Sequence, residues 1–177
     1  VTVILATSES RASALYNAYY AYAPDGGYAF DIEQTDEMTS LELNFASKNY
    51  ERFNYLAGLF YYDNDGRYDP LTIYNDTPEF IISIFGYQTS ETYAGFGEIN
   101  IDISDNLMLT AGLRYSVEYR AVRGGGGFGE FDEPNAPLAD FGDETFESVT
   151  PRLSLRYALG EYSNVYFTYS EGFKSGG

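Results

Sequence analysis

Hydrophobic and polar residues alternate along three stretches of the chain, and each stretch consists of two alternating runs joined by a short turn. The turns fall at Lys48–Arg52, Ser104–Asn106 and Gly160–Asn164, about 56 residues apart. Alternation with a period of two places successive side chains on opposite faces of a β-strand. The pattern therefore predicts three β-hairpins, which long acidic and glycine-rich segments connect.

The middle hairpin shows the alternation most clearly. Its second run extends over 14 residues from Leu107 to Arg120, with apolar residues on one face and mainly polar residues on the other. Strands of soluble domains usually have about 5–6 residues, whereas a tilted strand needs about 9–11 residues to cross a membrane. This run is long enough for a membrane-spanning strand.

The flanking hairpins repeat the pattern less regularly. Their runs cover Leu41–Ala46, Phe53–Tyr62, Val149–Leu159 and Val165–Lys174. Proline has no N–H to donate to a central ladder, so we expect Pro151 near the outer end of its strand.

The first part of the chain predicts a less regular beginning of the sheet. A strand runs from Val1 toward Ala12, Ala14–Gln34 is a tyrosine-rich loop, and a strand resumes near Asp36. Together with the three hairpins, this gives about seven strands. The predicted fold class is all-β, with antiparallel transmembrane β-barrel hairpins.

Two long loops are expected at Arg67–Gly86 and Gly124–Thr145, at the end of the sheet opposite the short turns. Short turns at one end and long loops at the other are typical of outer-membrane β-barrels. We expect Asp63–Gly66 to form a hairpin-end turn, because Tyr74 stands where a calcium loop needs its closing glutamate. The four glycines Gly124–Gly127 lack the lysine of a phosphate loop and indicate flexible or close-packed backbone.

Composition and charge exclude several classes of function. A formal charge of −17 disfavours a nucleic-acid binder. The absence of histidine and cysteine removes the usual general base and the commonest metal ligands. No apolar run approaches the roughly 18 residues of a transmembrane helix. We therefore expect no enzymatic activity, no cofactor and no metal.

Several segments resemble strand motifs of TonB-dependent outer-membrane receptors. These segments are Ser40–Ser47, Tyr93–Glu98 with Leu113–Tyr115, Val149–Leu155 and Tyr169–Gly177. Position 171 holds glutamate where the family usually has arginine. The similar segments follow the order and spacing of the family over roughly residues 36–177.

The resemblance implies an integral barrel of about 22 strands in the outer membrane of a Gram-negative bacterium, plugged by a globular domain. It implies TonB-dependent uptake of a scarce nutrient, such as a ferric siderophore, haem, cobalamin or an oligosaccharide. Residues 1–177 then form part of that barrel domain, without the plug, the N-terminal part that contacts the TonB complex, or the C-terminal closing strands. The ends at Val1 and Gly177 suggest a piece of a longer protein.

Charged residues on the more polar strand face form the first candidate site. They are Glu98, Arg114, Glu118, Arg120, Arg152, Arg156 and Lys174. In the family that the chain resembles, such a lining faces the barrel lumen and contacts the plug domain. The alternative is a solvated sheet face whose charges pair across strands.

Aromatic residues of the predicted loops form the second candidate site, for contact with cargo. They are Tyr16, Tyr19, Tyr20, Tyr68, Tyr74 and Phe128. The alternative is that tyrosines near strand ends form the aromatic girdle at the membrane interface. We expect this girdle to include Tyr61, Tyr62, Tyr115 and Tyr119.

Three other functions compete with the transport receptor. A small self-closed outer-membrane barrel would serve as an adhesin or a structural protein. An outer-membrane barrel enzyme would need a histidine that this chain lacks. A soluble β-sandwich would bury its apolar faces against each other. The acidic segments are compatible with cation collection, with divalent ions that bridge to lipopolysaccharide, or with solubility alone.

Overall fold

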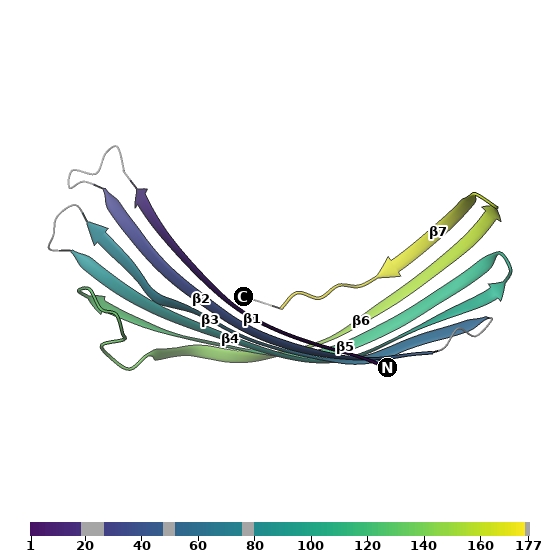
Figure 1. Cartoon of the computed structure of the whole chain (residues 1–177), viewed down its shortest axis with the longest axis horizontal. Coiled ribbons are helices and arrows are strands. Elements are labelled where there is room, and N and C mark those ends of the chain that lie inside the picture. Colours follow the sequence, from purple (N-terminus) through teal and green to yellow (C-terminus); the bar gives the residue numbers. More distant parts are fainter. Residues whose placement is uncertain (19–26, 48–51, 76–79, 176–177) are drawn as a thin grey trace.

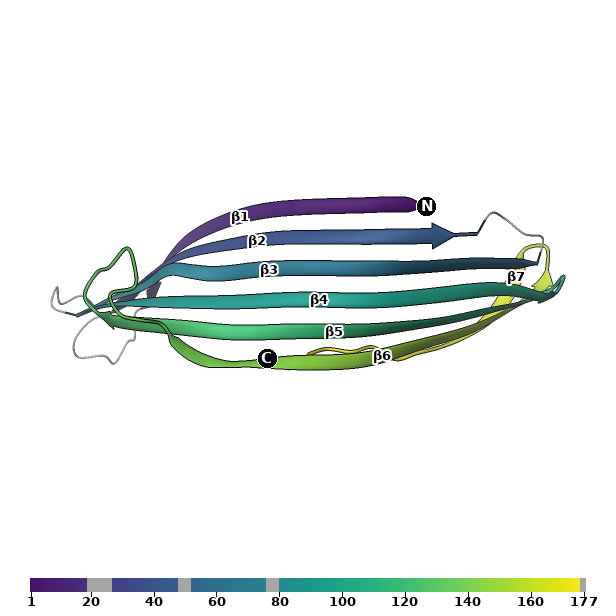
Figure 2. The same ribbon diagram turned by 90° about the horizontal axis from the view of Figure 1, so that it is seen from below.

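The computed structural model describes residues 1–18, 27–47, 52–75 and 80–175, and these residues form one antiparallel sheet. Its strands are β1 (Thr2–Ala18), β2 (Tyr28–Ala46), β3 (Phe53–Asn75), β4 (Ile81–Ser104), β5 (Leu107–Phe128), β6 (Ala139–Gly160) and β7 (Ser163–Ser170). They lie side by side in chain order (Figure 2). The all-β class, the antiparallel pairing and the number of about seven strands are confirmed. Within the described ranges, no helix is long and apolar enough to cross a membrane.

The sheet is a single curved layer with a concave and a convex face (Figure 1). The segment after β7 lies on the concave side (Figure 1), where the Ser175 hydroxyl donates a hydrogen bond to Glu118 Oε1 at 3.1 Å. The concave face is therefore the one that carries Glu118 and, by strand register, Glu98 and Arg152. In the described part of the chain, no ladder joins β1 to β7.

The convex face carries a continuous apolar band at the short-turn end of the strands. Its residues alternate within Leu41–Phe45, Phe53–Tyr61, Tyr93–Ile103, Leu107–Val117, Val149–Leu159 and Val165–Tyr169. The four middle segments have 9 or 11 residues each, which matches a tilted membrane-spanning strand. Leu59 is 58% exposed and Leu113 is 54% exposed. No second layer of the described chain covers this face, unlike in a soluble sandwich.

The strands are longer than the alternation predicted. The loops expected at Ala14–Gln34, Arg67–Gly86 and Gly124–Thr145 are largely strand, because β1 to β6 extend well beyond the apolar band. In these extensions the two faces differ little in polarity. Both faces are largely polar or glycine in Asp63–Pro70 and Gly124–Gly127, and both carry apolar residues in Ile81–Phe85, so the alternating signal stops while the backbone ladder continues. The start of a strand near Asp36 and the turn at Asp63–Gly66 were therefore wrong, since both lie inside strands.

The short turns agree with the predictions where the structure describes them. Asp105 and Asn106 connect β4 to β5, and Glu161 and Tyr162 connect β6 to β7. The turn expected at Lys48–Arg52 lies almost entirely outside the described residues.

Pro151 lies in the middle of β6, not near its outer end as expected. Its carbonyl oxygen accepts a hydrogen bond from the Glu171 N–H at 3.1 Å, so its backbone faces β7. The N and C=O of one residue point to the same side of an antiparallel strand. The paired ladder between β6 and β7 begins with Arg152 and Ser170. The missing N–H therefore falls where the pairing with β7 ends, and no central ladder bond is lost.

The β5–β6 connection folds back onto the convex face at the long-loop end. Ser83 is fully buried there, and its hydroxyl donates to the Gly129 carbonyl at 3.0 Å and accepts from the Phe131 N–H at 3.1 Å. Phe85 is only 2% exposed. A Cβ atom on Gly126 would lie 2.6 Å from the Ser83 carbonyl oxygen. The glycine run is thus close-packed strand.

Candidate functional site

Six of the seven predicted charged residues share the concave face. They are Glu98 on β4, Arg114, Glu118 and Arg120 on β5, and Arg152 and Arg156 on β6. Lys174 is the exception, because β7 ends at Ser170 and Lys174 follows outside the sheet. The run expected to continue to Lys174 was therefore too long.

A glycine allows an ion pair between two strands of this face that are not neighbours. Glu98, Gly112 and Arg152 lie in one row across β4, β5 and β6. Arg152 Nη1 lies 3.4 Å from Glu98 Oε2, and an added Cβ on Gly112 would lie 3.5 Å from the same oxygen. Because the middle residue has no side chain, the two charged side chains meet above it.

Arg114 packs on two aromatic rings of neighbouring strands. Its guanidinium carbon lies 5.0 Å from the ring centre of Phe60 and 5.8 Å from that of Phe96, within range of cation–π attraction. Its Nε donates to Ser116 Oγ at 3.0 Å. The Phe96 ring covers Gly58 of β3, and a Cβ atom added to Gly58 would lie 2.3 Å from this ring. Arg114 is thus held in place by β3 and β4.

Glu118 and Arg120 form a half-buried ion pair farther along β5. Arg120 Nε lies 2.6 Å from Glu118 Oε1, and their side chains are 31% and 18% exposed. Arg156 is exposed on β6, in register with Tyr166 of β7.

The concave face offers charges of both signs and hydrogen-bonding groups. Among the described residues, no three acidic residues are grouped to hold a metal ion. The side-chain oxygens of Asn44 and Asn54 are buried on this face without a hydrogen-bond partner. Such a face is suited to bind a polar protein surface.

The four predicted cargo-contact residues that the structure describes lie on strands rather than in loops. Tyr16 belongs to β1, Tyr68 and Tyr74 to β3, and Phe128 ends β5. By register Tyr16, Tyr68 and Phe128 share the concave face, whereas Tyr74 lies on the convex face. Tyr19 and Tyr20 lie outside the described residues.

Two aromatic residues that sequence reasoning missed as site residues join Phe128 at the long-loop end. The Phe80 ring packs edge-on against Phe128, with centroids 5.9 Å apart, and against Tyr28 at 6.4 Å. We call Tyr28, Phe80 and Phe128 the aromatic rim. Their positions far apart in sequence gave no signal for this cluster.

Three tyrosines on the convex face lie at the border of the apolar band nearer the long connections, and each of them donates to a carboxylate. Tyr61 and Tyr93 both donate to Glu91 Oε1, at 3.3 and 2.5 Å, and Tyr115 donates to Glu147 at 2.8 Å. Tyr61 and Tyr115, both expected in the girdle, lie at this border, and Tyr119 shares their face. Tyr93 was missed. Tyr62 was wrongly included, because it is on the concave face and stacks on Phe60.

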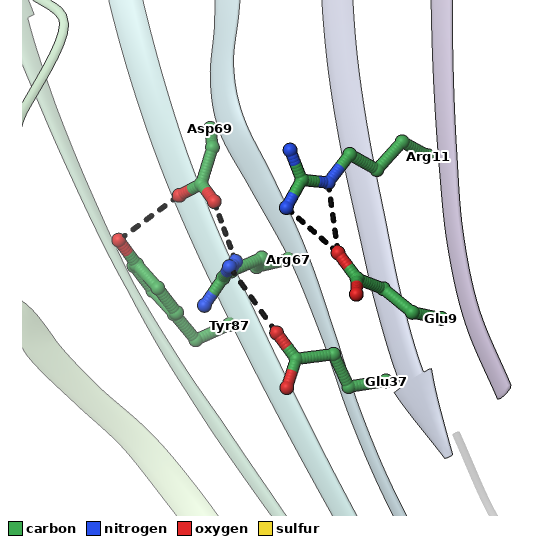
Figure 3. A network of polar contacts seen from close by, with 6 residues as sticks. All are labelled: Glu9, Arg11, Glu37, Arg67, Asp69 and Tyr87. Atoms are coloured by element: carbon green, nitrogen blue, oxygen red, sulfur yellow. Dashed lines mark hydrogen bonds and ion pairs between the residues drawn. The ribbon is translucent and has the colours of Figure 1, made fainter. Parts of the chain in front are cut away.

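A polar network ties three strands together just beyond the band (Figure 3). Arg67 contacts Glu37 of β2 at 3.4 Å and Asp69 at 2.6 Å. The Tyr87 hydroxyl of β4 donates to Asp69 at 3.2 Å, and partial burial together with the Asp69 carboxylate raises the pKa of this hydroxyl. Arg11 pairs with Glu9 on β1 at 2.7 Å (Figure 3).

Comparison with known proteins identifies relatives over nearly the whole chain. Residues 5–177 match the family described as TonB dependent receptor-like, beta-barrel. No curated protein sequence matches the chain.

Two solved structures share the fold. The ferric yersiniabactin uptake receptor FyuA from Yersinia pestis has a TM-score of 0.76 and 20% identity, over 93% of this chain and 24% of that protein. The ferric-catecholate import receptor Fiu from E. coli K12, in its open form, has a TM-score of 0.63 and 14% identity, over 95% of this chain and 32% of that protein. This chain thus spans about a quarter to a third of the length of these receptors.

Proposed function

We infer the function from one premise: this chain belongs to the TonB dependent receptor-like β-barrel family. We propose that residues 1–177 form part of a single barrel domain of about 22 strands, integral to the outer membrane of a Gram-negative bacterium. The complete receptor would take up a scarce nutrient, with a ferric siderophore as the leading candidate. We assign the chain no enzymatic role, no cofactor and no nucleic-acid partner.

The exposed apolar band of the convex face is the observation that carries this proposal. A soluble protein rarely leaves so large a continuous apolar surface in water, whereas outer-membrane lipid covers such a band on a barrel. Strands that extend beyond the band only toward the long connections fit a barrel whose outer half rises above the membrane. The concave face of the sheet is charged and would line the lumen.

The concave charged face would contact the plug domain of the same receptor. Arg152 with Glu98, Arg114 on its two rings, and Arg120 with Glu118 present both charge signs to a protein partner. Arg156 on β6 extends the candidate surface toward β7, and Lys174, in the segment after β7, remains part of the proposed contact.

The aromatic rim would contact cargo at the outer end of the barrel. It lies on the concave face, together with Tyr16 and Tyr68. The names of FyuA and Fiu connect those receptors to ferric yersiniabactin and to ferric catecholates. A ferric siderophore with planar rings is therefore our proposed cargo, since such rings stack on aromatic side chains. Transport would depend on the TonB complex, contacted through a part of the receptor outside this chain.

An uptake assay with the complete receptor tests this function. The receptor is expressed in a Gram-negative host that lacks its own siderophore receptors, and radioactive iron is supplied on single siderophores. We expect uptake of at least one ferric siderophore, and no uptake in a matched host with an inactive TonB complex.

Two results would contradict different parts of the proposal. Uptake that persists without the TonB complex would overturn active transport. Uptake of haem, cobalamin or an oligosaccharide, but of no ferric siderophore, would overturn the cargo and leave the receptor assignment intact.

A further inference from the structure

Two strand irregularities flank one pair of glycines on the concave face, in the half of the sheet near the long connections. Gly86 of β4 and Gly124 of β5 lie directly opposite each other. The pairing of β3 with β4 shifts directly after Tyr68, and the pairing of β5 with β6 skips Phe141. Gly142, next to the skipped residue, has a φ of 118°, which glycine adopts without strain. Bulges of this kind change the direction of a side chain and are frequent beside functional sites.

Each irregularity carries an aromatic ring over one of the two glycines. A Cβ on Gly86 would lie 3.2 Å from the Tyr68 ring, and one on Gly124 would lie 2.8 Å from the Phe141 ring. The two glycines thus make room for the two rings. Tyr68 is 43% exposed and Phe141 is 70% exposed, so much of each ring remains accessible from the concave side. We call Tyr68 and Phe141 the ring pair.

Two hollows adjoin the ring pair and share Gln88 and Val122, which lie opposite each other on β4 and β5. The hollow beside Tyr68 has a volume of about 220 Å³, and the hollow beside Phe141 has a volume of about 480 Å³. The exposed Gln88 amide can both donate and accept hydrogen bonds. Aromatic and apolar surface with a few hydrogen-bonding groups is the usual composition of a small-molecule site.

Carboxylates exceed cations around the two hollows. Asp36 of β2 lines the hollow beside Tyr68, and Glu144 of β6 lines the hollow beside Phe141. Glu144 lies opposite Arg120 in the strand register, and Arg120 also pairs with Glu118 at 2.6 Å. These three carboxylates and one guanidinium give this part of the wall an excess of negative charge. The wall therefore favours a ligand without negative charge, because like charges brought together repel.

The ring pair lies between the aromatic rim and the Glu118–Arg120 ion pair. On β5, Gly124 is four residues from Phe128 of the rim and four residues from Arg120. At roughly 3.3 Å per residue, each of these steps is about 13 Å long. A ligand that moves from the rim along the concave face would therefore reach the ring pair before it reaches the ion pair.

We propose that the ring pair is a second cargo subsite, deeper than the aromatic rim, for the planar rings of an iron(III) complex without net negative charge. A ring of the complex would stack on Tyr68 or Phe141, and Gln88 would form a hydrogen bond with a polar group at the edge of that ring. This proposal rests on the proposed function, because it requires the concave face to line the lumen of a ferric siderophore receptor. It narrows the cargo to neutral or cationic complexes that carry rings.

Binding of three iron(III) complexes to the complete receptor, purified in detergent, separates the effect of rings from the effect of charge. The tris(3-hydroxy-4-pyridinonate) complex has planar rings and no net charge. The tris(catecholate) complex has planar rings and three negative charges, and a linear trihydroxamate complex has neither rings nor net charge. In titration calorimetry, we expect the wild-type receptor to bind the hydroxypyridinonate complex most tightly.

Variants of the ring pair and of the carboxylates test each part of the site. Tyr68→Leu/Phe141→Leu removes both rings but keeps apolar side chains. It should weaken binding of the hydroxypyridinonate complex about tenfold and leave binding of the trihydroxamate complex unchanged. The matched control is Tyr166→Leu, which removes an exposed tyrosine from the concave face near the short turn between β6 and β7, and it should change neither. Asp36→Asn/Glu144→Gln should raise the affinity for the tris(catecholate) complex relative to the hydroxypyridinonate complex.

The outcomes separate this subsite from the proposed function. Each variant is first checked for a mobility shift on boiling, as a sign of a closed barrel. A wild-type receptor that takes up no ferric siderophore would contradict the proposed function itself. A wild type that takes up a ferric siderophore but binds none of the three complexes would overturn only the subsite.

Two further results would each overturn one part of the site. Unchanged binding of the hydroxypyridinonate complex after loss of both rings would overturn the ring contact, and faster proteolysis of the plug domain in that variant would assign the ring pair to the plug instead. Tighter binding of the tris(catecholate) complex than of the hydroxypyridinonate complex by the wild type would overturn the charge preference.

Discussion

Gly58 leaves the space in which the Phe96 ring lies, and this ring in turn supports Arg114. A Cβ at position 58 would be 2.3 Å from the ring and 2.8 Å from the Leu43 carbonyl oxygen. The ring can move, but the backbone carbonyl has no such freedom. The glycine is thus required by its neighbours on both sides.

We predict that Gly58→Ala destabilises the receptor by about 1–3 kcal/mol, the usual cost of overpacking. Urea unfolding of the detergent-solubilised receptor, followed by circular dichroism, measures the change. Gly95→Ala is the control, because its new methyl group would meet nothing closer than 3.9 Å. Equal stability of the two variants would show that Phe96 and β2 adjust freely around position 58.

Asp63, at the border of the apolar band nearer the long connections, makes the stability of the folded receptor depend on pH. Its pKa is raised in the folded protein, first by partial burial and then by the charges of Asp65 and Glu91. The folded state therefore binds a proton more tightly than the unfolded state, and stability increases as the pH falls through the raised pKa. At pH 7 the ionised carboxylate lowers stability.

Asp63→Asn should therefore raise the unfolding temperature slightly at pH 7, and the gain should vanish in acid, where Asp63 is protonated. The effect is small because this side chain is only partly buried, so solvent still screens its charge. Thermal unfolding of wild type and variant at both pH values measures it. A gain that is equal at the two pH values would assign the effect to something other than charge.

At the scale of the strand, the side of the ladder that a residue faces decides whether proline is tolerated. Pro151 faces β7 where the pairing ends, whereas the neighbouring Thr150 faces β5 and pairs with Arg114 in the middle of the sheet. We predict that Pro151→Ala is nearly neutral. Thr150→Pro removes a ladder donor and leaves a buried acceptor, which costs roughly 1–3 kcal/mol.

The yield of folded, heat-resistant receptor in the outer membrane compares these two variants. Because the substitutions are adjacent on one strand, they differ mainly in the direction of the missing N–H. A strong loss with Pro151→Ala would show that proline itself is needed there, for example to end β7.

The alternation predicted those parts of each strand whose two faces differ in polarity. The run Leu107–Arg120 was recognised because one of its faces is apolar and the other is mainly polar. Under the proposed function, the apolar face contacts lipid and the polar face lines the lumen. The rest of β5, up to Phe128, carries glycines on both faces and has no such contrast. Strand extensions held by the backbone ladder alone leave no pattern to detect, so they were interpreted as loops.

The alternation also predicted correctly which face of the sheet a residue lies on, except beyond a β-bulge. A bulge inserts an extra residue, so residues of the same parity then lie on opposite faces. Glu98, Arg114 and Arg152 are all even-numbered and share the concave face. Tyr68 and Tyr74 are also even-numbered, yet an irregularity between Tyr68 and Leu71 places them on opposite faces. Which residues lie opposite each other depends on the pairing register of two strands, and the sequence of a single strand does not determine this register. The pairing of Glu98 with Arg152 over Gly112 was therefore not predictable.

For the whole molecule, the open edges of the sheet are decisive. In the described residues β1 pairs only with β2, β7 pairs only with β6, and β6 pairs with β7 only from Arg152 onward. Backbone N–H and C=O groups along β1, β7 and the first half of β6 therefore have no ladder partner. Such edges invite pairing with other chains, and a closed barrel has none. A small self-closed barrel would need β1 and β7 to join.

We therefore predict that the 177-residue chain, refolded alone in detergent, shows no mobility shift between boiled and unboiled samples on SDS gels. Resistance to SDS depends on a closed ladder, and the isolated segment leaves its edges open to the detergent or to a second copy. The complete receptor, analysed beside it, should shift on boiling. A shift of the isolated chain would mean that its two edges close on each other, and the self-closed adhesin or structural barrel would then replace the receptor segment as the better account of this sequence.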